Sequence, residues 1–416
     1  MLQKIGMLRF LIVLCSWILL FHTPVCAKSY TLGSVQEVAD EKKQPLTLTA
    51  KAAVLMDGEN GRILYEKCAD EVMANASTTK ILTAIVVLEH CDLREKVCVS
   101  KHAAARPKVR LGIREGEQYY VEDLLYAMLL KSCNDCASAL AEHVAGSEEA
   151  FSKLLNEKAD AIGCRQTFFI TPNGLDAKKD GKIHGTSAKE LALMTRYALS
   201  NETFCDIIRT RSHTFLDVAG KRTHTVSNTN RFLQMDEDAI GVKTGYTSQA
   251  GYCFVGACRS EERLFISVVL GSGWPPHKNE KWNDTQKLMS YGKEQFTMRE
   301  LYQELHLKPF AVMDGVVSEV PICQSKKSMR LLLSDEDDVT RKVTYFAEHD
   351  APVLKGQVVG KVSYYVNDIL YDETELYTLL ASEKYDYFYC LKKVIANYLV
   401  TNEKQNGQRK NSIKIR

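Results

Sequence analysis

One long apolar helix is the feature that most restricts how this chain can fold. Ser77 and Lys80 stand three residues apart, and residues 81–88 then carry apolar side chains on nearly every side of a helix. Such a segment has to be buried, so the rest of the chain must build a core around it. Asn75 and Ser77 favour the start of a helix, which predicts that Ser77 lies near its N-terminus.

The spacing of Ser77 and Lys80 places both side chains on one face of that helix. A lysine rooted in an apolar helix is desolvated, which favours its neutral, basic form. A neutral amine beside a hydroxyl can take its proton and make the oxygen a nucleophile. The Ser-x-x-Lys pattern alone is weak, because it recurs at Ser290 and Lys293, so its context has to decide.

Two further short motifs follow along the chain. Ser132 and Asn134 flank a cysteine between two predicted helices, and Lys243, Thr244 and Gly245 begin a predicted strand. Ser132 can relay a proton to a leaving group, and Asn134 can hold a lysine and a substrate amide. Lys243 and Thr244 offer a cation and a hydroxyl to a carboxylate, and Gly245 leaves room for a peptide along the strand. Singly these residues are most often caps, turns or solvated charges; their ordered occurrence indicates a nucleophilic active site.

The N-terminal residues 1–27 have the pattern of an export signal, with a positive start, an apolar core and a small-residue cleavage site. The core is short for a transmembrane span, and an uncleaved anchor is the alternative. Removing this segment leaves eleven of the 13 cysteines, an odd number that indicates buried free thiols. The net charge of +2 gives no indication of nucleic-acid binding, and no cysteine spacing indicates a zinc site.

These motifs and their flanks resemble the low-molecular-mass penicillin-binding proteins, specifically the serine-type D-alanyl-D-alanine carboxypeptidases. The matching flanks are residues 76–84, 134–147, 172–176, 241–253 and 351–362, so the resemblance covers roughly residues 45–400. It implies an α+β transpeptidase-like domain, with an antiparallel sheet and helices, followed by a small all-β domain. We therefore expect six segments: an export signal (1–27), a linker (28–44), a D,D-peptidase domain (45–298), a small β-sandwich (299–382), an amphipathic membrane-anchor helix (383–400) and a disordered basic tail (401–416).

The resemblance also implies a reaction. Ser77 attacks the carbonyl between two D-alanines of a peptidoglycan stem peptide, and Lys80 is the general base. The implied catalytic residues are Ser77, Lys80 and Ser132, and the implied substrate-binding residues are Asn134, Lys243, Thr244, Gly245 and Tyr246. The backbone N–H groups of Ser77 and Tyr246 form the oxyanion hole. β-Lactams would acylate the serine, and no metal or cofactor is required. The enzyme would act at the outer face of the cytoplasmic membrane.

Two departures from the family pattern leave alternatives open. The middle motif has Cys133 where glycine is usual, and Asn75 stands where proline is usual. Neither change removes a catalytic group; Cys133 is either a packing thiol or a second nucleophile. The other functions compatible with these motifs are a class A-like β-lactamase, a D,D-endopeptidase and a non-catalytic wall-binding protein. We expect His184 in a loop and His143 on a helix surface, and the tail helix either on a membrane or packed on the β domain.

Overall fold

The computed structural model describes residues 29–31, 46–302, 305–325, 328–346 and 349–412. The predicted export signal lies outside these residues, as does most of the expected linker. Within that linker, strand β1 (Ser29–Thr31) pairs with β18 (Val339–Tyr345). The chain forms two compact units: one is Glu41–Met298 with Leu332–Ser334, and the other contains Arg299–Leu331 and Asp335–Arg416.

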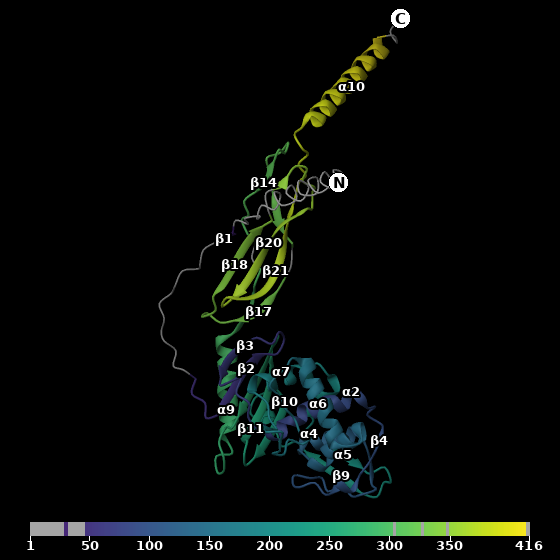
Figure 1. Ribbon diagram of the computed structural model, residues 1–416, viewed down its shortest axis with the longest axis vertical. Coiled ribbons are helices and arrows are strands. Elements are labelled where there is room, and N and C mark those ends of the chain that lie inside the picture. Colours follow the sequence, from purple (N-terminus) through teal and green to yellow (C-terminus); the bar gives the residue numbers. More distant parts are fainter. Residues whose placement is uncertain (1–28, 32–45, 303–304, 326–327, 347–348, 413–416) are drawn as a thin grey trace, which may run out of the picture. The chain divides into compact units, whose positions relative to one another are not determined.

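The larger unit is built on a five-stranded antiparallel sheet in the order β10-β11-β12-β2-β3 (Figure 1). Its strands are β2 (Ala52–Asp57), β3 (Ile63–Lys67), β10 (Ala239–Thr247), β11 (Gly251–Ser260) and β12 (Arg263–Leu270). The glycines and asparagine at residues 58–61, between two apolar segments, predict a hairpin over residues 52–65, which is confirmed as β2 and β3. Strand β10 lies at one edge of this sheet among the described strands.

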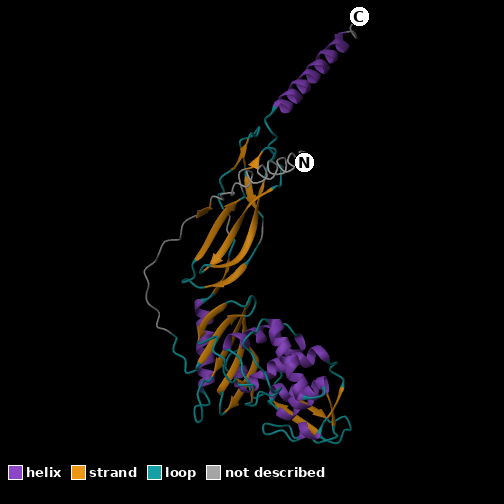
Figure 2. Ribbon diagram, viewed as in Figure 1, coloured by secondary structure: helices purple, strands orange, loops and turns teal. Residues whose placement is uncertain are grey.

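Helices cover both faces of the sheet, as Figure 2 shows. The helices are η1 (Ala76–Thr79), α2 (Lys80–His90), α3 (Lys101–Ala104), α4 (Val121–Leu130), α5 (Asn134–Ala145), α6 (Glu148–Ile162), α7 (Ala188–Ala198), α8 (Glu202–Arg209), η2 (Arg231–Gln234) and α9 (Glu280–Gln295). Three two-stranded ribbons complete the unit: β4 (Lys96–Cys98) with β5 (Gln118–Tyr120), β6 (Lys178–Lys179) with β7 (Lys182–Ile183), and β8 (Ser212–Leu216) with β9 (Thr223–Ser227).

The strands serve two hydrophobic cores because successive side chains point to opposite faces. On β2, Val54 and Met56 join the core formed with α2 and α4 to α7. The intervening Leu55 joins a second core with Trp282 and Leu288 of α9. Continuously apolar strands of this kind are expected when both faces of a sheet are covered.

Local sequence signals locate several helices well. The apolar segment that follows Glu122 and Asp123 predicts a helix over residues 121–130, which coincides with α4. Gly146, predicted as a C-cap, ends α5 at φ 79. Ser187 with Glu190 three residues later predicts a capping box, but only half of it forms: Ser187 Oγ accepts from the Glu190 backbone N–H at 3.2 Å. The Glu190 carboxylate instead accepts hydrogen bonds from Gln166 and Thr167, because tertiary partners compete with the local one.

In its described residues the second unit is all-β apart from its C-terminal helix, which confirms the expected fold class. One sheet has the order β1-β18-β20-β21-β16, and a smaller one has the order β15-β14-β19. The strands in the C-terminal part of the chain are β13 (Thr297–Glu300), β14 (Phe310–Met313), β15 (Glu319–Val320), β16 (Ile322–Gln324), β17 (Arg330–Leu333), β18, β19 (His349–Asp350), β20 (Val358–Val366) and β21 (Ile369–Thr378).

The C-terminal helix α10 (Tyr387–Ser412) is longer than expected. The prediction of a disordered tail from residue 401 is wrong as far as Ser412, because the glutamate, lysine, glutamine and arginine side chains there favour helix. Apolar side chains near its start are exposed, including Tyr387 at 74% and Ile395 at 50%. None of the described helices combines the length and apolar character needed to cross a bilayer.

Candidate active site

The predicted nucleophile lies in a 3-10 turn directly before the buried helix. Ser77 belongs to η1, and α2 begins at Lys80, whose side chain is fully buried. The Lys80 Nζ lies 2.8 Å from Ser77 Oγ and donates hydrogen bonds to Asn134 Oδ1 at 2.9 Å and to the Asn173 carbonyl at 2.6 Å. All three of these partners are neutral, so none of them would balance the positive charge of a protonated Lys80.

The electrostatic surroundings of Lys80 favour the amine. Burial, followed by the positive charge of Lys243, lowers the pKa of Lys80 well below its usual value. The opposing contributions of Cys133, Cys136 and Asp135 are smaller. These surroundings favour the neutral form of an amine that lies within hydrogen-bond distance of a serine hydroxyl.

The second motif occupies the turn between α4 and α5. Ser132 has a left-handed backbone at φ 67, which is uncommon for serine and turns its side chain into the site. Its Oγ accepts a hydrogen bond from Lys243 Nζ at 3.0 Å, so its partner is Lys243 rather than Lys80. Asn134 is the first residue of α5, and its Nδ2 donates to the Pro107 carbonyl at 3.3 Å. Cys133 is fully buried, as expected of a packing thiol.

The third motif lies on the edge strand β10. Lys243 is buried, and its Nζ also donates to the Thr244 carbonyl at 2.9 Å. Burial, with a smaller contribution from Lys281, lowers the pKa of Lys243 to about 7. Tyr246 is 44% exposed two residues further along the strand from Thr244.

A glycine is needed at position 245 because the strand passes close to the Ser77 turn, whereas the sequence predicted that it leaves room for a bound peptide. A Cβ at this position would lie 3.0 Å from the Ser77 backbone nitrogen and 3.1 Å from the Asn75 carbonyl oxygen. The missing side chain therefore lets β10 approach the nucleophile turn, which brings the third motif against the first.

The loop at residues 172–176 contacts Ser77 and Lys80, and the sequence did not predict this role. The Asn173 carbonyl accepts from Lys80 Nζ and from Ser77 Oγ, the latter at 3.3 Å. Gly174 has φ +80, and a Cβ there would lie 2.0 Å from the Ala76 carbonyl oxygen. The only sequence signal was the Pro-Asn-Gly-Leu-Asp string itself, which has the composition of a turn.

His184 lies in the loop after β7, as expected, but it is buried beneath the nucleophile turn. Its Nδ1 accepts from the Ile170 backbone N–H at 2.8 Å, so Nε2 carries the proton and donates to Thr79 Oγ1 at 2.9 Å. Burial is the main cause that lowers the pKa of His184 to about 3. The neutral imidazole supports the turn through Thr79, whose hydroxyl in turn donates to the Ala76 carbonyl at 2.9 Å.

Two other sequence patterns have structural roles. Lys293 of the second Ser-x-x-Lys pattern forms ion pairs with Asp236 at 2.9 Å and Asp238 at 2.8 Å, and Ser290 is exposed. Near the site, Cys133, Asp135 and Cys136 form a buried group. The Asp135 carboxylate is saturated by four backbone N–H groups, from residues 111, 112, 113 and 136, so we do not assign a metal to it.

The family comparisons agree with this geometry. A family model described as D-alanyl-D-alanine carboxypeptidase matches residues 38–273. A second, described as the C-terminal domain of penicillin-binding protein 5, matches residues 296–384. D-alanyl-D-alanine carboxypeptidase DacF of Bacillus subtilis is 30% identical over 328 residues, which cover 77% of this chain and 82% of that protein.

D-alanyl-D-alanine carboxypeptidase DacC of Escherichia coli is also 30% identical, over 79% of this chain and 83% of its own length. Among solved structures, D-alanyl-D-alanine carboxypeptidase DacD from Francisella tularensis has the same fold. It aligns with a TM-score of 0.68 and 23% identity over 84% of this chain and 97% of its own. The family match over more than half of the sequence, together with these relatives, shows that this chain belongs to the D-alanyl-D-alanine carboxypeptidase family.

Proposed function

We propose that this protein is a serine-type carboxypeptidase that removes the terminal D-alanine from peptidoglycan stem pentapeptides. The observation that carries the proposal is the fully buried Lys80 Nζ, 2.8 Å from Ser77 Oγ, with only neutral hydrogen-bond partners. Membership of the family supplies the substrate class. A neutral amine in this position is a general base, and the serine oxygen is the nucleophile that it activates.

In the proposed acylation step, the Ser77 hydroxyl passes its proton to Lys80 as the oxygen attacks the carbonyl of the penultimate D-alanine. The backbone N–H groups of Ser77 and Tyr246 donate to the developing oxyanion. Fixed donors of this kind act without reorganisation when charge develops, so they stabilise the transition state more than the substrate. The peptide lies along the open edge of β10, as an added strand.

The leaving D-alanine is held by its carboxylate in this proposal. Lys243 in its cationic form and the Thr244 hydroxyl bind the carboxylate. The departing amine receives, through the Ser132 hydroxyl, the proton that Lys80 took from Ser77, so Lys80 becomes neutral again. Lys243 Nζ, 3.0 Å from Ser132 Oγ, orients that hydroxyl and keeps its own charge. Asn134 holds Lys80 and orients the acyl chain. Water then hydrolyses the acyl-enzyme and restores the serine.

A β-lactam would acylate the same serine. Rapid β-lactamase turnover needs a carboxylate that activates water. Apart from each other, Ser77 and Lys80 have as hydrogen-bond partners in the described part of the chain the Asn134 side-chain amide and the Asn173 backbone carbonyl, neither of which is a carboxylate. We therefore expect a long-lived penicilloyl adduct.

The decisive experiment combines D-alanine release from a synthetic stem pentapeptide with intact mass after exposure to benzylpenicillin. We expect release of D-alanine and one penicilloyl adduct, both absent in Ser77→Ala. The matched control is Ser290→Ala, the exposed serine of the other Ser-x-x-Lys pattern, which should behave as the parent. Cleavage only of cross-linked dimers would indicate an endopeptidase, and rapid penicillin hydrolysis without an adduct a β-lactamase. Neither adduct nor turnover would refute catalysis.

We also propose that the enzyme is exported and that α10 lies on the outer face of the cytoplasmic membrane. Support comes from exposed aromatic and aliphatic side chains near the start of the helix, among them Phe388 at 75% and Tyr398 at 67%, which are typical of an interfacial helix. Flotation with vesicles of phosphatidylglycerol tests this. Binding should be lost in the double variant Leu391→Glu, Ile395→Glu; equal binding by this variant would refute the membrane contact.

A further inference from the structure

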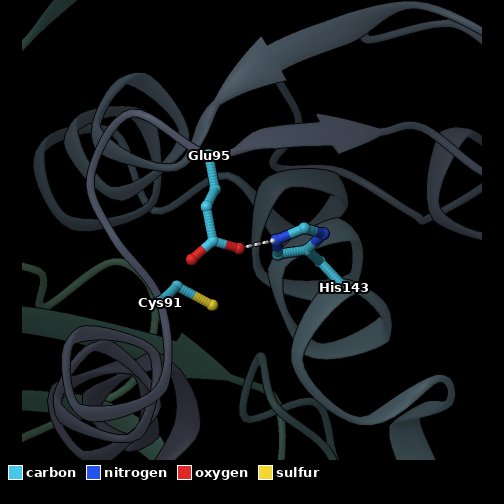
Figure 3. A group of neighbouring side chains, drawn as sticks. All are labelled: Cys91, Glu95 and His143. Carbon is cyan, nitrogen blue, oxygen red and sulfur yellow. Dashed lines mark hydrogen bonds and ion pairs between the residues drawn. The ribbon is translucent and has the colours of Figure 1, made fainter.

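The two helices that begin in the active site also end close together. Helix α2 begins at Lys80 and is followed directly by Cys91, while α5 begins at Asn134 and carries His143 in its last turn. Glu95 lies in the turn that precedes β4. The Cys91 sulfur, a Glu95 carboxylate oxygen and a His143 ring nitrogen lie within 4.8 Å of one another. Figure 3 shows the three side chains converging from separate segments.

Existing hydrogen bonds already orient two of these side chains. Glu95 Oε2 lies 3.0 Å from His143 Nε2, and Glu95 Oε1 accepts from the Asp92 backbone N–H at 2.6 Å. The His143 side chain is 23% exposed and that of Glu95 is 42% exposed. The group is therefore positioned before any ligand arrives and can be reached from solvent.

The local electrostatic potential favours a cation. The C-terminal ends of α2 and α5 both lie here, and a helix C-terminus carries a partial negative charge. Glu95 adds a full negative charge, and Asp92 lies next to Cys91 in the sequence. A divalent cation would relieve this accumulation of negative charge.

We propose that Cys91, Glu95 and His143 bind one Zn²⁺ ion, with water as the fourth ligand. A thiolate, an imidazole and a carboxylate are together typical zinc ligands, whereas magnesium and calcium do not take sulfur. Zinc bonds of about 2.0–2.3 Å in a tetrahedron place ligand atoms about 3.3–3.6 Å apart. The Glu95–His143 pair needs to open by only a few tenths of an ångström, and the Cys91 sulfur can approach by rotation about its Cα–Cβ bond.

Zinc binding would release the Cys91 thiol proton to solvent, and the metal would replace the Glu95–His143 hydrogen bond. The ion would then join the far ends of two helices whose near ends are linked by the 2.9 Å Lys80–Asn134 hydrogen bond. Eleven residues of α2 separate the two places by about 16 Å along the helix axis. The ion would stabilise the catalytic unit and take no part in the peptide reaction, so this inference does not depend on the proposed function.

The test is metal binding by the purified, reduced and chelator-stripped protein. We expect one equivalent of Zn²⁺ by competition with a chromogenic chelator. Bound Co²⁺ should show the thiolate-to-cobalt charge-transfer absorption of a cysteine ligand. Zinc at about a hundredfold above its Kd should raise the Tm by about 5–10 °C. The variants Cys91→Ser and His143→Ala should each weaken binding at least tenfold, since each loses one of three ligands.

The matched controls come from neighbouring residues outside the group. Cys98→Ser removes an exposed thiol on β4, and His102→Ala removes an exposed histidine that pairs with Glu142 at 2.6 Å. Both should bind zinc as the parent does. The proposal is overturned by equal zinc affinity in Cys91→Ser and the parent, by cobalt spectra without a thiolate band, or by no binding at micromolar zinc.

Discussion

The contact between the loop at residues 172–176 and the nucleophile turn can be tested with one added methyl group. In Gly174→Ala the new Cβ would lie 2.0 Å from the Ala76 carbonyl oxygen, whereas real Cβ contacts below 3.0 Å are essentially never seen. The loop and the turn must therefore separate by about 1 Å at a point adjacent to Ser77. Misplacement of a catalytic group by about 1 Å can reduce a rate by about 10²-fold, which corresponds to about 2.7 kcal/mol of transition-state stabilisation.

Backbone strain has to be separated from this contact. Gly174 has φ +80, and any side chain in the left-handed region costs about 1–2 kcal/mol. Gly181 provides the matched control, because it has φ +78 but no atom within 4 Å of an added Cβ. Gly181→Ala should therefore carry the same strain, with a Tm lowered by about 2–8 °C, and should keep its acylation rate.

The assay is the second-order rate constant for acylation by a fluorescent penicillin, measured on both variants below their Tm. We expect Gly174→Ala to react about 10²-fold more slowly than Gly181→Ala. If the two variants acylate within threefold of each other while both are folded, the loop does not position Ser77 and the reasoning is refuted.

Three further predictions concern the site. Lys80→Arg should lower acylation by about 10²–10⁴-fold, because a guanidinium stays charged and cannot act as a base; near-parental activity would exclude Lys80 as the general base. The Lys243 amine, with its pKa near 7, should be cationic below that pH and neutral above it, so kcat/KM for the stem peptide should fall as the pH rises through about 7. This fall should be absent in Lys243→Arg, and an identical profile in both would contradict the carboxylate-binding role. Cys133→Ala should acylate within threefold of the parent and lose about 1–2 kcal/mol of stability in urea unfolding, as a buried thiol leaves a small cavity; loss of acylation would indicate a direct role.

The local part of the structure was predictable because short-range rules determine it. The apolar run after Lys80 predicts a buried helix, and α2 is buried over residues 80–87. Gly146 predicts a C-cap and has the left-handed backbone. Ser77 lies near the start of this helix, as predicted, in a 3-10 turn that directly precedes α2 at Lys80. The short helix α8 was missed, although Asn201 provides an N-cap whose side chain accepts from the Phe204 backbone N–H.

The packing contacts that bring the three motifs together could not be predicted from local sequence patterns. The sequence by itself determined which residues can carry out acyl transfer, because its three motifs follow one another in the order typical of the family. These motifs contain Ser77 and Lys80, Ser132 and Asn134, and Lys243. Only the tertiary structure decided that Ser132 bonds to Lys243 and that His184 supports the nucleophile turn from a distance of 105 residues through Thr79.

The same distinction applies to the proposed zinc site. Cys91 and Glu95 are neighbours in the sequence, but His143 is 48 residues beyond Glu95, and no spacing rule connects it to them. Periodicity reports which face of a helix is buried, whereas the pairing of remote side chains depends on how the helices pack. Packing is determined by the complementarity of whole surfaces, so it belongs to the folded chain rather than to any one segment of it.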